Sequence, residues 1–276
     1  MGVRQVMAQL NLDGQVLPIA GGDVNQNFRI NTSESSYFIK LQPNGRPDFF
    51  PAEVDGLAAL APFVRVPKVY DWGQADQDSY LLMEWLEPEA GSQADLARAL
   101  AQVHRQAAET FGWPEDNFMG ILPQVNAQTD DWPLFFITCR LDVQVELAKL
   151  HNVWHDKREA HYLRLKEFIQ KDWAPRTVPP SLLHGDFWSG NVLFSKGEVV
   201  FLDPAVSFGD RELDIAMSQL FGGFTDEFLA TYLAEFPLPE GWEARQPIYQ
   251  LYYLLVHLNQ FGESYGSQVD RILQNF

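Results

Sequence analysis

Three polar residues in the second half of the chain have the types and the spacing that phosphoryl transfer requires. Asp186 and Asn191 are five positions apart, and Asp203 follows at a distance of twelve. An aspartate can accept the proton of an attacking hydroxyl group, whereas an asparagine and a second aspartate offer the hard oxygen ligands that Mg²⁺ prefers. Each residue alone is more simply a turn or cap residue. Their combination at these spacings favours chemistry, and the small residues Ser189 and Gly190 allow the chain to turn sharply between Asp186 and Asn191.

The chain between Asn191 and Asp203 predicts a β-hairpin. Two apolar runs, 192–194 and 199–202, flank the polar segment 195–198, which we interpret as a four-residue turn. A hairpin returns the chain to its starting point, so Asp203 is expected beside Asn191. The two side chains would then hold Mg²⁺, with phosphate and water oxygens as the remaining ligands.

A lysine near the start of the chain is a candidate for binding the phosphates. Lys40 ends the apolar run 37–40, and a period of two places Phe38 and Lys40 on the same face of a strand. Glu53 lies early in the helix predicted over 51–60 and could pair with Lys40 to fix it over the phosphates. Without Glu53, Lys40 would equally be an exposed lysine at the end of a strand.

Two further segments could bind a nucleotide through their backbone. The first contains Gly21, Gly22 and Asn25, between the first two predicted strands, and its N–H groups could cover phosphates. Such a turn is common, and neither a G-x-G-x-x-G motif nor a Walker A motif is present. The second consists of Met83, Glu84 and Leu86. It could bond the edge of an adenine base, and it is equally an ordinary exit from a strand.

Candidate substrate contacts lie on both sides of Asp203. Trp188 is either a core residue or an apolar platform for a sugar ring, and we favour the platform. Glu212 and Asp214 belong to an acidic segment that would suit a protonated amine. The same acids are equally explained as the first turn of a helix capped by Asp210. The histidines are scattered without the spacing of metal ligands, so they predict no metal site.

The pattern of elements predicts an α+β fold. Residues 1–86 are strand-rich and would form a nucleotide-binding N-terminal lobe, and residues 87–276 are mainly helical and would form the catalytic, substrate-binding lobe. A polar linker over 86–92 separates them. Strands are expected over 16–20, 27–31, 37–41, 66–72 and 79–83, and helices over 51–60, 93–109, 130–151, 156–171, 210–220, 226–235, 244–261 and 264–275.

Composition excludes several classes of partner. The chain has 276 residues and a net charge of −17, so nucleic acid and anionic membrane surfaces are not expected to bind it. Its single cysteine, Cys139, forms no internal disulfide, and the first residues lack the apolar stretch of a signal peptide. We therefore expect a cytoplasmic protein, and we expect it to be a monomer or a weak homodimer.

The motifs together resemble the fructosamine-3-kinase (ketosamine-3-kinase) family, within the aminoglycoside-phosphotransferase-like kinases. The general His-Gly-Asp…Asn pattern is shared widely, and the Trp-Ser-Gly-Asn continuation at 188–191 is more specific. The similarity extends in order over 21–26, 50–57, 117–120, 184–191, 208–217, 220–224 and 251–259. Two departures are Phe187, where leucine is common, and Asp23-Val24, in place of a cysteine found in some members.

The resemblance implies a protein-kinase-like fold with a small antiparallel-sheet N-terminal lobe and a larger helical C-terminal lobe. It also implies an ATP-dependent phosphotransferase that requires Mg²⁺ and phosphorylates a sugar hydroxyl of ketosamines such as fructosamine or ribulosamine. The partner would then be a small molecule or a glycated amine, and the purpose of the reaction would be protein deglycation. Asp186 would then be the catalytic residue. Two alternatives stay open: a kinase of another hydroxyl compound (an aminoglycoside, choline or an amino alcohol), and a nucleotide-binding pseudokinase.

Overall fold

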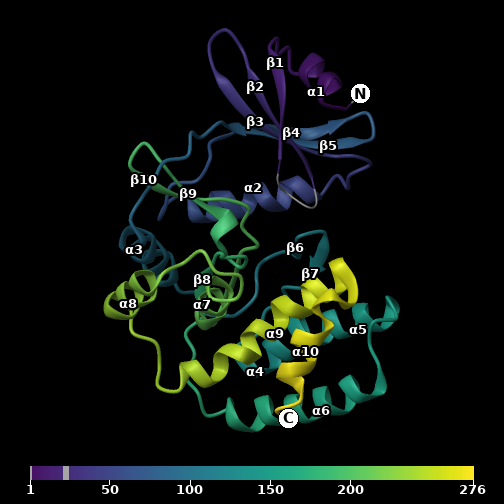
Figure 1. Ribbon diagram of the computed structural model, residues 1–276, viewed down its shortest axis with the longest axis vertical. Helices are drawn as coiled ribbons and strands as arrows, with labels where there is room; N and C mark the ends of the chain where they lie inside the picture. The colour runs from purple at the N-terminus through teal and green to yellow at the C-terminus, as the bar shows by residue number, and fades with distance from the viewer. Residues whose placement is uncertain (1, 21–24) are drawn as a thin grey trace. The chain divides into compact units, whose positions relative to one another are not determined.

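The computed structural model describes residues 2–20 and 25–276 and divides the chain into two compact units (Figure 1). The first unit is Met1–Ser92 together with Asn191–Pro204, and the second is Gln93–Gly190 together with Ala205–Phe276. The chain first passes from one unit to the other after Ser92, six residues beyond the predicted boundary at residue 86. The lobes themselves, 1–86 and 87–276, remain a prediction about function.

The first unit contains a five-stranded antiparallel sheet, in the order β1-β2-β3-β5-β4. The strands are β1 (Gln15–Ile19), β2 (Gln26–Asn31), β3 (Ser36–Gln42), β4 (Val69–Ala75) and β5 (Asp78–Glu84). Each of the five strands predicted in this part of the sequence corresponds to one of these strands, and the ends agree within three residues.

Two helices pack on this sheet, α1 (Gly2–Gln9) and α2 (Phe49–Leu60). Val6 and Met7 of α1 share a buried cluster with Ile39 and Leu41 of β3. Lys40 lies between these two residues, so the alternation of a strand turns its side chain to the opposite face. The short α1 was not expected from the sequence, whereas α2 begins two residues before the predicted start.

The predicted hairpin is present, with a tighter turn than expected. β9 (Val192–Ser195) pairs with β10 (Glu198–Phe201) so that Ser195 lies opposite Glu198. The turn therefore has two residues instead of four, and its Lys196 and Gly197 have φ angles of 54° and 75°. Both values are positive, as a type I′ turn requires, and this turn matches the twist of the two strands.

The hairpin belongs to the first unit, although it follows a long helical segment in the sequence. The Glu89 N–H donates to the Phe194 carbonyl at 2.8 Å, and the Phe201 N–H donates to the Arg65 carbonyl at 3.0 Å. A Cβ atom on Gly91 would lie 2.0 Å from the Phe194 ring, so only glycine fits where the linker crosses the hairpin. These contacts with residues 65–91 explain why the hairpin does not group with the helices.

The second unit is mainly helical, and its long helix α9 contributes many residues to the largest buried hydrophobic cluster. The helices are α3 (Gln93–His104), α4 (Trp132–Phe135), the π-helix η1 (Phe136–Leu141), α5 (Asp142–Leu150), α6 (Asp156–Asp172), α7 (Glu212–Ser218), α8 (Asp226–Glu235), α9 (Trp242–Phe261), the 3₁₀ helix η3 (Gly262–Tyr265) and α10 (Gly266–Leu273). A further 3₁₀ turn, η2 (Ser189–Asn191), follows the segment that carries Asp186.

Short strands join distant parts of the second unit. β6 (Asn117–Met119) pairs with β7 (Leu122–Gln124), and β8 (Ser181–Leu183) pairs with β11 (Ser207–Gly209). α3 ends at His104 instead of the predicted 109, because the chain then turns to pair with residues 180–181. The β8–β11 pair places the residues after Leu183 beside those before Ser207.

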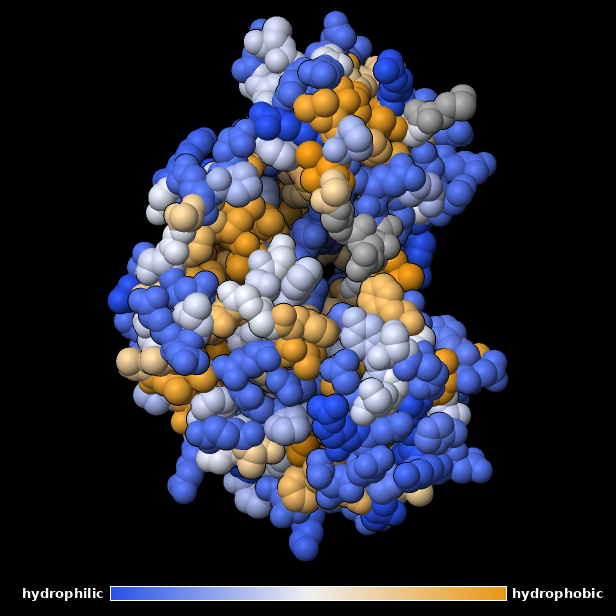
Figure 2. Space-filling model, viewed as in Figure 1, coloured by the Kyte–Doolittle hydropathy of each residue, from blue (hydrophilic) through white to orange (hydrophobic). Residues whose placement is uncertain are grey.

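Within the ranges 2–20 and 25–276, no helix is both long enough and apolar enough to cross a membrane. The face of the molecule shown in Figure 2 is largely hydrophilic, in agreement with the charged composition.

Candidate active site

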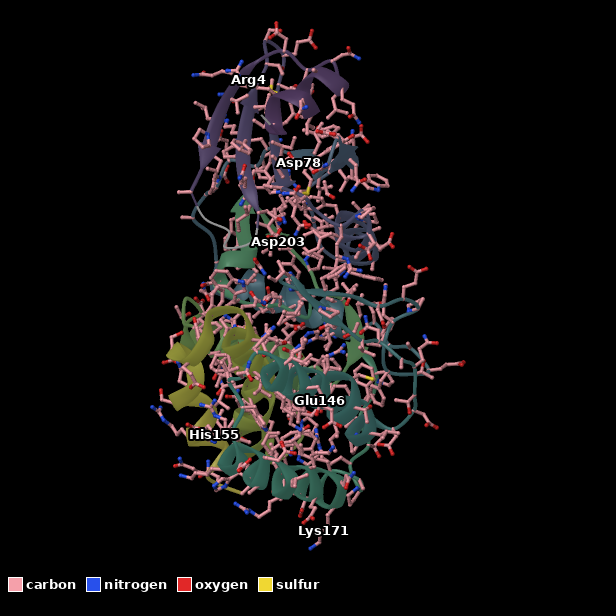
Figure 3. All side chains as sticks on the ribbon, turned by 90° about the vertical axis from the view of Figure 1, so that its right-hand side faces the viewer. Arg4, Asp78, Glu146, His155, Lys171 and Asp203 are labelled. Carbon is pink, nitrogen blue, oxygen red and sulfur yellow. The ribbon has the colours of Figure 1, made fainter. Side chains whose placement is uncertain are left out.

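The first unit places Lys40 between two carboxylates. Its Nζ lies 2.7 Å from Glu53 Oε1 and 2.5 Å from Asp203 Oδ1. Lys40 comes from the middle of the sheet, Glu53 from α2, and Asp203 from the chain after β10, where Figure 3 labels it. The three residues span 163 positions in the sequence, and the structure brings them into one ion-paired group.

Burial and charge act in opposite directions on this group. Burial lowers the pKa of Lys40, but the nearby Asp203 and Glu53 carboxylates outweigh it and raise that pKa, so the ammonium stays charged. Burial raises the pKa of Glu53 to about 7, although the positive charge of Lys40 opposes the shift. The Asp203 side chain is 47% exposed. Lys40 and Glu53 are therefore held in the interior, whereas Asp203 faces solvent.

Asp203 has an unusual backbone conformation. Its φ angle is 51°, in the left-handed region that costs an L-residue roughly 1–2 kcal/mol. Backbone strain of this kind is frequent at functional residues. The Leu202 N–H donates to the Asn191 carbonyl at 2.9 Å, so the ends of the hairpin meet, as predicted.

Asn191 and Asp203 suit a magnesium ion held jointly with a ligand. Their amide and carboxylate oxygens are hard donors, and Mg²⁺ commonly takes only one or two carboxylates from the protein and the rest of its ligands from phosphate and water. In the part of the chain that is described, no cluster of three or more His, Cys, Asp or Glu residues could hold a metal without such a ligand. The donor set therefore fits Mg²⁺ bound together with a nucleotide.

The second unit carries the predicted proton acceptor, Asp186, on a tightly held loop. Gly185 has a φ angle of 86°, and a Cβ atom there would lie 2.0 Å from the Ala205 carbonyl oxygen. The Ala205 N–H donates to the His184 carbonyl at 2.8 Å, and the Asp186 N–H donates to His184 Nδ1 at 3.2 Å. Glycine is thus required before Asp186, and His184 is an internal support of the loop.

Asp214 holds the same loop from α7. Its carboxylate accepts the His184 N–H at 2.7 Å and the Gly185 N–H at 2.9 Å, and it lies 3.1 Å from His104 Nε2. His104 Nδ1 lies 2.7 Å from the Tyr232 hydroxyl. Burial lowers the pKa of His104, so the ring is neutral, with Nε2–H donating to Asp214 and Nδ1 accepting from Tyr232.

The structure corrects the prediction that Glu212 and Asp214 contact substrate. Both residues are completely buried. The Glu212 carboxylate pairs with Arg245 at 2.6 Å and with Arg176 at 3.0 Å. Each oxygen of both carboxylates has a protein partner, because the helix that these acids begin is packed in the interior and not along a surface. The alternative explanation, a structural role at a helix start, is the better one.

The remaining nucleotide-binding predictions are untested by the geometry. Gly21 and Gly22 lie outside the described residues. The Oδ1 atom of Asn25, the next predicted contact, is buried and has no hydrogen-bond partner among residues 2–20 and 25–276. The other three residues lie where β5 ends: Met83 and Leu86 are buried, and Glu84 pairs with Arg65 at 3.1 Å. Their backbone role at an adenine stays a prediction.

Trp188 is 37% exposed. A Cβ atom on Gly190 would lie 2.2 Å from its ring, so the indole folds back over the loop and requires glycine there. An exposed aromatic ring next to Asp186 is compatible with a platform for a sugar, which stays a prediction.

Sequence reasoning missed the residues that support the loop from a distance. His104 precedes Asp214 by 110 positions, and Tyr253 follows Gly185 by 68. Nothing in the local sequence connects such pairs. Tyr253 lies in a segment that contributed to the family resemblance, which was the only signal available for it.

Known proteins resemble this chain over nearly its whole length. A model of the fructosamine kinase family matches residues 4–276. A probable ketoamine kinase of Enterococcus faecium is 55% identical, with 100% of each chain covered. The chloroplastic protein-ribulosamine 3-kinase of Arabidopsis thaliana is 34% identical, and the match covers 94% of this chain and 81% of that protein.

Solved structures confirm the expected α+β, protein-kinase-like fold. A candidate fructosamine-3-kinase from Thermobifida fusca superposes with a TM-score of 0.87 at 30% identity, covering 99% of this chain and 98% of that one. An aminoglycoside phosphotransferase superposes with a TM-score of 0.65 at 17% identity, covering 99% and 98%, and shows that the two proteins share the fold. With a family model that spans nearly every residue, the chain belongs to the fructosamine kinase family.

Proposed function

We propose that the protein is an ATP-dependent kinase that transfers phosphate to a sugar hydroxyl of ketosamines. The observation that carries the proposal is the ion-paired group of Lys40, Glu53 and Asp203. A buried lysine held by a glutamate, next to a solvent-exposed aspartate, is the arrangement that kinases use to bind the phosphates and metal of ATP. Family membership supports the ketosamine substrate, since relatives carry the names ketoamine kinase and protein-ribulosamine 3-kinase.

Each residue of the proposed site has a distinct role. Asp186 accepts the proton of the attacking hydroxyl and orients its oxygen toward the terminal phosphate. Lys40, kept charged and fixed by Glu53, neutralises phosphate charge. Asn191 and Asp203 would hold Mg²⁺, which supplies electrostatic stabilisation of the charge that develops on the phosphate oxygens.

The proposal also assigns residues that contact the adenine base and the sugar. The backbone around Met83, Glu84 and Leu86 binds the adenine edge, and Trp188 stacks on the sugar. We do not assign Glu212 or Asp214 to the substrate, because both are buried and bonded internally.

A phosphotransfer assay tests the proposal directly. ADP release is measured with Mg·ATP and a panel: fructose- and ribulose-derived lysine adducts, a glycated protein, choline and an aminoglycoside. We expect turnover with the ketosamines and none with choline or the aminoglycoside. Turnover confined to choline or the aminoglycoside would refute the substrate class. Nucleotide binding without turnover on any compound would instead favour the pseudokinase alternative.

A variant of the proton acceptor tests the mechanism. Asp186→Asn keeps the shape of the side chain but cannot accept the proton, so we expect turnover to fall by about 10²–10⁴-fold while nucleotide affinity is retained. Asp226→Asn, a change at an exposed acid at the start of α8, is the control and should leave turnover unchanged. Near-wild-type turnover of Asp186→Asn would remove Asp186 from the reaction.

A further inference from the structure

We propose that Tyr252 and Tyr253, neighbours on α9, are positioning residues: Tyr253 holds the base loop (residues 184–186), and Tyr252 holds the metal loop (residues 203–206). The inference rests on the proposed function, because the loops are named for the roles of Asp186 and Asp203. It assigns to one helix, remote in sequence from both loops, the task of fixing the two chain segments that carry the reacting groups.

Tyr253 fixes the peptide bond that leads into Asp186. Its hydroxyl donates to the Gly185 carbonyl at 2.8 Å, and the tyrosine is completely buried. The N–H of the same peptide, that of Asp186, donates to His184 Nδ1 at 3.2 Å. Both polar ends of this peptide plane are therefore bonded. Without the hydroxyl, a buried carbonyl would lose its donor, and the plane would be free to rotate and move the Asp186 side chain.

Tyr252 acts on the metal loop through one intermediate side chain. Its hydroxyl donates to Gln124 Oε1 at 2.8 Å, and Gln124 Nε2 donates to the Ala205 carbonyl at 3.1 Å. Gln124 Nε2 also donates to Asn117 Oδ1 at 2.8 Å, and Asn117 Nδ2 donates to the Val206 carbonyl at 2.8 Å. Two consecutive carbonyls, two and three residues after Asp203, are thus held by one buried amide network.

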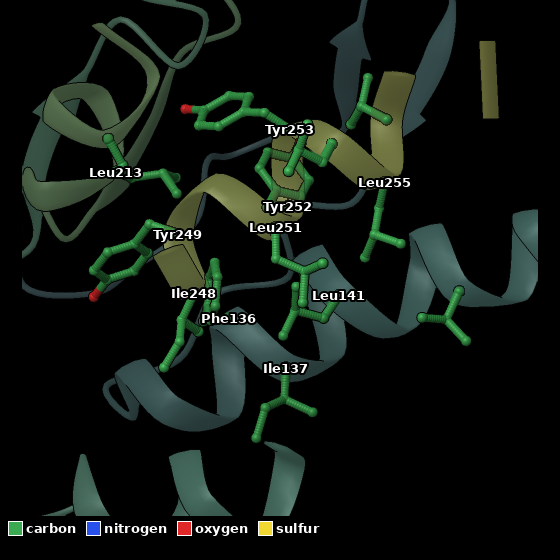
Figure 4. Packing of buried hydrophobic residues seen from close by; sticks show 14 of the residues in the cluster. Phe136, Ile137, Leu141, Leu213, Ile248, Tyr249, Leu251, Tyr252, Tyr253 and Leu255 are labelled. Carbon is green, nitrogen blue, oxygen red and sulfur yellow. The ribbon is translucent and has the colours of Figure 1, made fainter. Parts of the chain in front are cut away.

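The two loops are also joined directly. The Ala205 N–H donates to the His184 carbonyl at 2.8 Å, so a shift in one backbone is transmitted to the other. The rings of Tyr252 and Tyr253 lie 5.0 Å apart and appear together in Figure 4. Burial raises the pKa of both hydroxyls, so both remain protonated donors at neutral pH.

α9 offers a matched control in Tyr249, which is also labelled in Figure 4. This tyrosine is equally buried, and its hydroxyl donates to Asp210 Oδ2 at 2.7 Å. The same hydroxyl accepts from Trp132 Nε1 at 2.9 Å and from Arg176 Nη1 at 3.4 Å. Its removal therefore costs at least as much buried hydrogen bonding as removal of the other two hydroxyls but frees neither loop. Tyr→Phe changes at 249, 252 and 253 therefore separate positioning from general stability.

The experiment compares these three variants by kinetics and nucleotide titration. We expect Tyr253→Phe to lower kcat about tenfold, since small misplacements of a catalytic group are costly, with the Kd for Mg·ATP unchanged. We expect Tyr252→Phe to raise the Kd for Mg·ATP about fivefold, as the loss of one buried hydrogen bond allows. Tyr249→Phe should lower Tm and leave both constants unchanged. Equal effects of all three variants on kcat and Kd would overturn the proposal.

Hydrogen exchange of the backbone amides gives a readout that does not depend on turnover. Exchange in residues 183–187 should rise in Tyr253→Phe and stay at the wild-type level in Tyr249→Phe. If the wild-type protein phosphorylates nothing in the panel, the proposed function fails, and the exchange comparison still decides whether Tyr253 holds the loop. Unchanged exchange in Tyr253→Phe would refute the inference on its own.

A double-mutant cycle tests the route from Tyr252. Gln124→Leu removes the intermediate amide, so adding Tyr252→Phe to it should raise the Kd for Mg·ATP no further. Adding Tyr253→Phe to Gln124→Leu should still lower kcat. A full additional effect of Tyr252→Phe in the Gln124→Leu background would show that Tyr252 does not act through Gln124.

Discussion

The loop that carries Asp186 should depend strongly on the negative charge of Asp214, and the change Asp214→Asn tests this. One carboxylate oxygen, Oδ1, accepts the Gly185 N–H, and the other, Oδ2, accepts the His184 N–H and contacts His104 Nε2. An asparagine has the same shape but only one acceptor oxygen. Whichever way its amide is oriented, one buried backbone N–H meets an NH₂ group instead of an oxygen.

The cost follows from counting the groups affected. If the NH₂ replaces Oδ1, the Gly185 N–H loses its partner. If it replaces Oδ2, the His184 N–H loses its partner and His104 must change tautomer. One buried orphan donor costs about 1–3 kcal/mol, and the surviving bonds lose their charge assistance. We therefore expect Asp214→Asn to lower the free energy of unfolding by about 2–4 kcal/mol, and Tm by roughly 3–7 °C.

Denaturant unfolding and steady-state kinetics measure the two consequences. We expect kcat to fall about tenfold, because the freed amides precede Asp186 directly, while nucleotide affinity changes little. The control is Glu212→Gln, a change at an equally buried acid on the same helix that pairs with Arg176 and Arg245. It should reduce stability but spare kcat. The reasoning fails if Asp214→Asn keeps wild-type stability and kcat, or if Glu212→Gln lowers kcat equally.

Two further predictions concern pH and metal. Burial lowers the pKa of His104 from its ordinary value of about 6.5, so at acidic pH the unfolded chain binds a proton that the folded protein does not, and the free energy of unfolding decreases as the pH decreases. His104→Gln should reduce this pH dependence by at most about 1.4 kcal/mol per pH unit, measured by urea unfolding at several pH values. An unchanged slope would contradict this prediction. Lys40 Nζ lies 2.5 Å from Asp203, so its positive charge competes with a cation bound at Asp203. In the absence of nucleotide, the double variant Lys40→Met/Glu53→Gln should bind Mn²⁺ about tenfold more tightly than Glu53→Gln alone, as measured by electron paramagnetic resonance. Equal Mn²⁺ affinities of the two variants would exclude this competition.

The local chemistry was readable from the sequence because it depends on short spacings. The separation of Asp186 and Asn191, and the apolar runs before Asp203, predicted a loop and a hairpin that the structure contains. The hairpin turn was misjudged by two residues, since Lys196 adopts a positive φ that its residue type does not favour. α1 was missed because its helical pattern is short, and its stability depends on the sheet that it covers.

Amino-acid types and their order alone thus determined the class of the fold and the family, and they supplied the candidate residues for the chemistry. Only the tertiary structure decided which of them meet. The tertiary structure pairs Lys40 with Asp203, which is 163 positions away in the sequence. It also buries Asp214 against the backbone amides of the loop that carries Asp186. Hydrogen bonds and burial act over a few ångströms of space, and residues more than a hundred positions apart leave no periodicity in the sequence from which such contacts could be predicted.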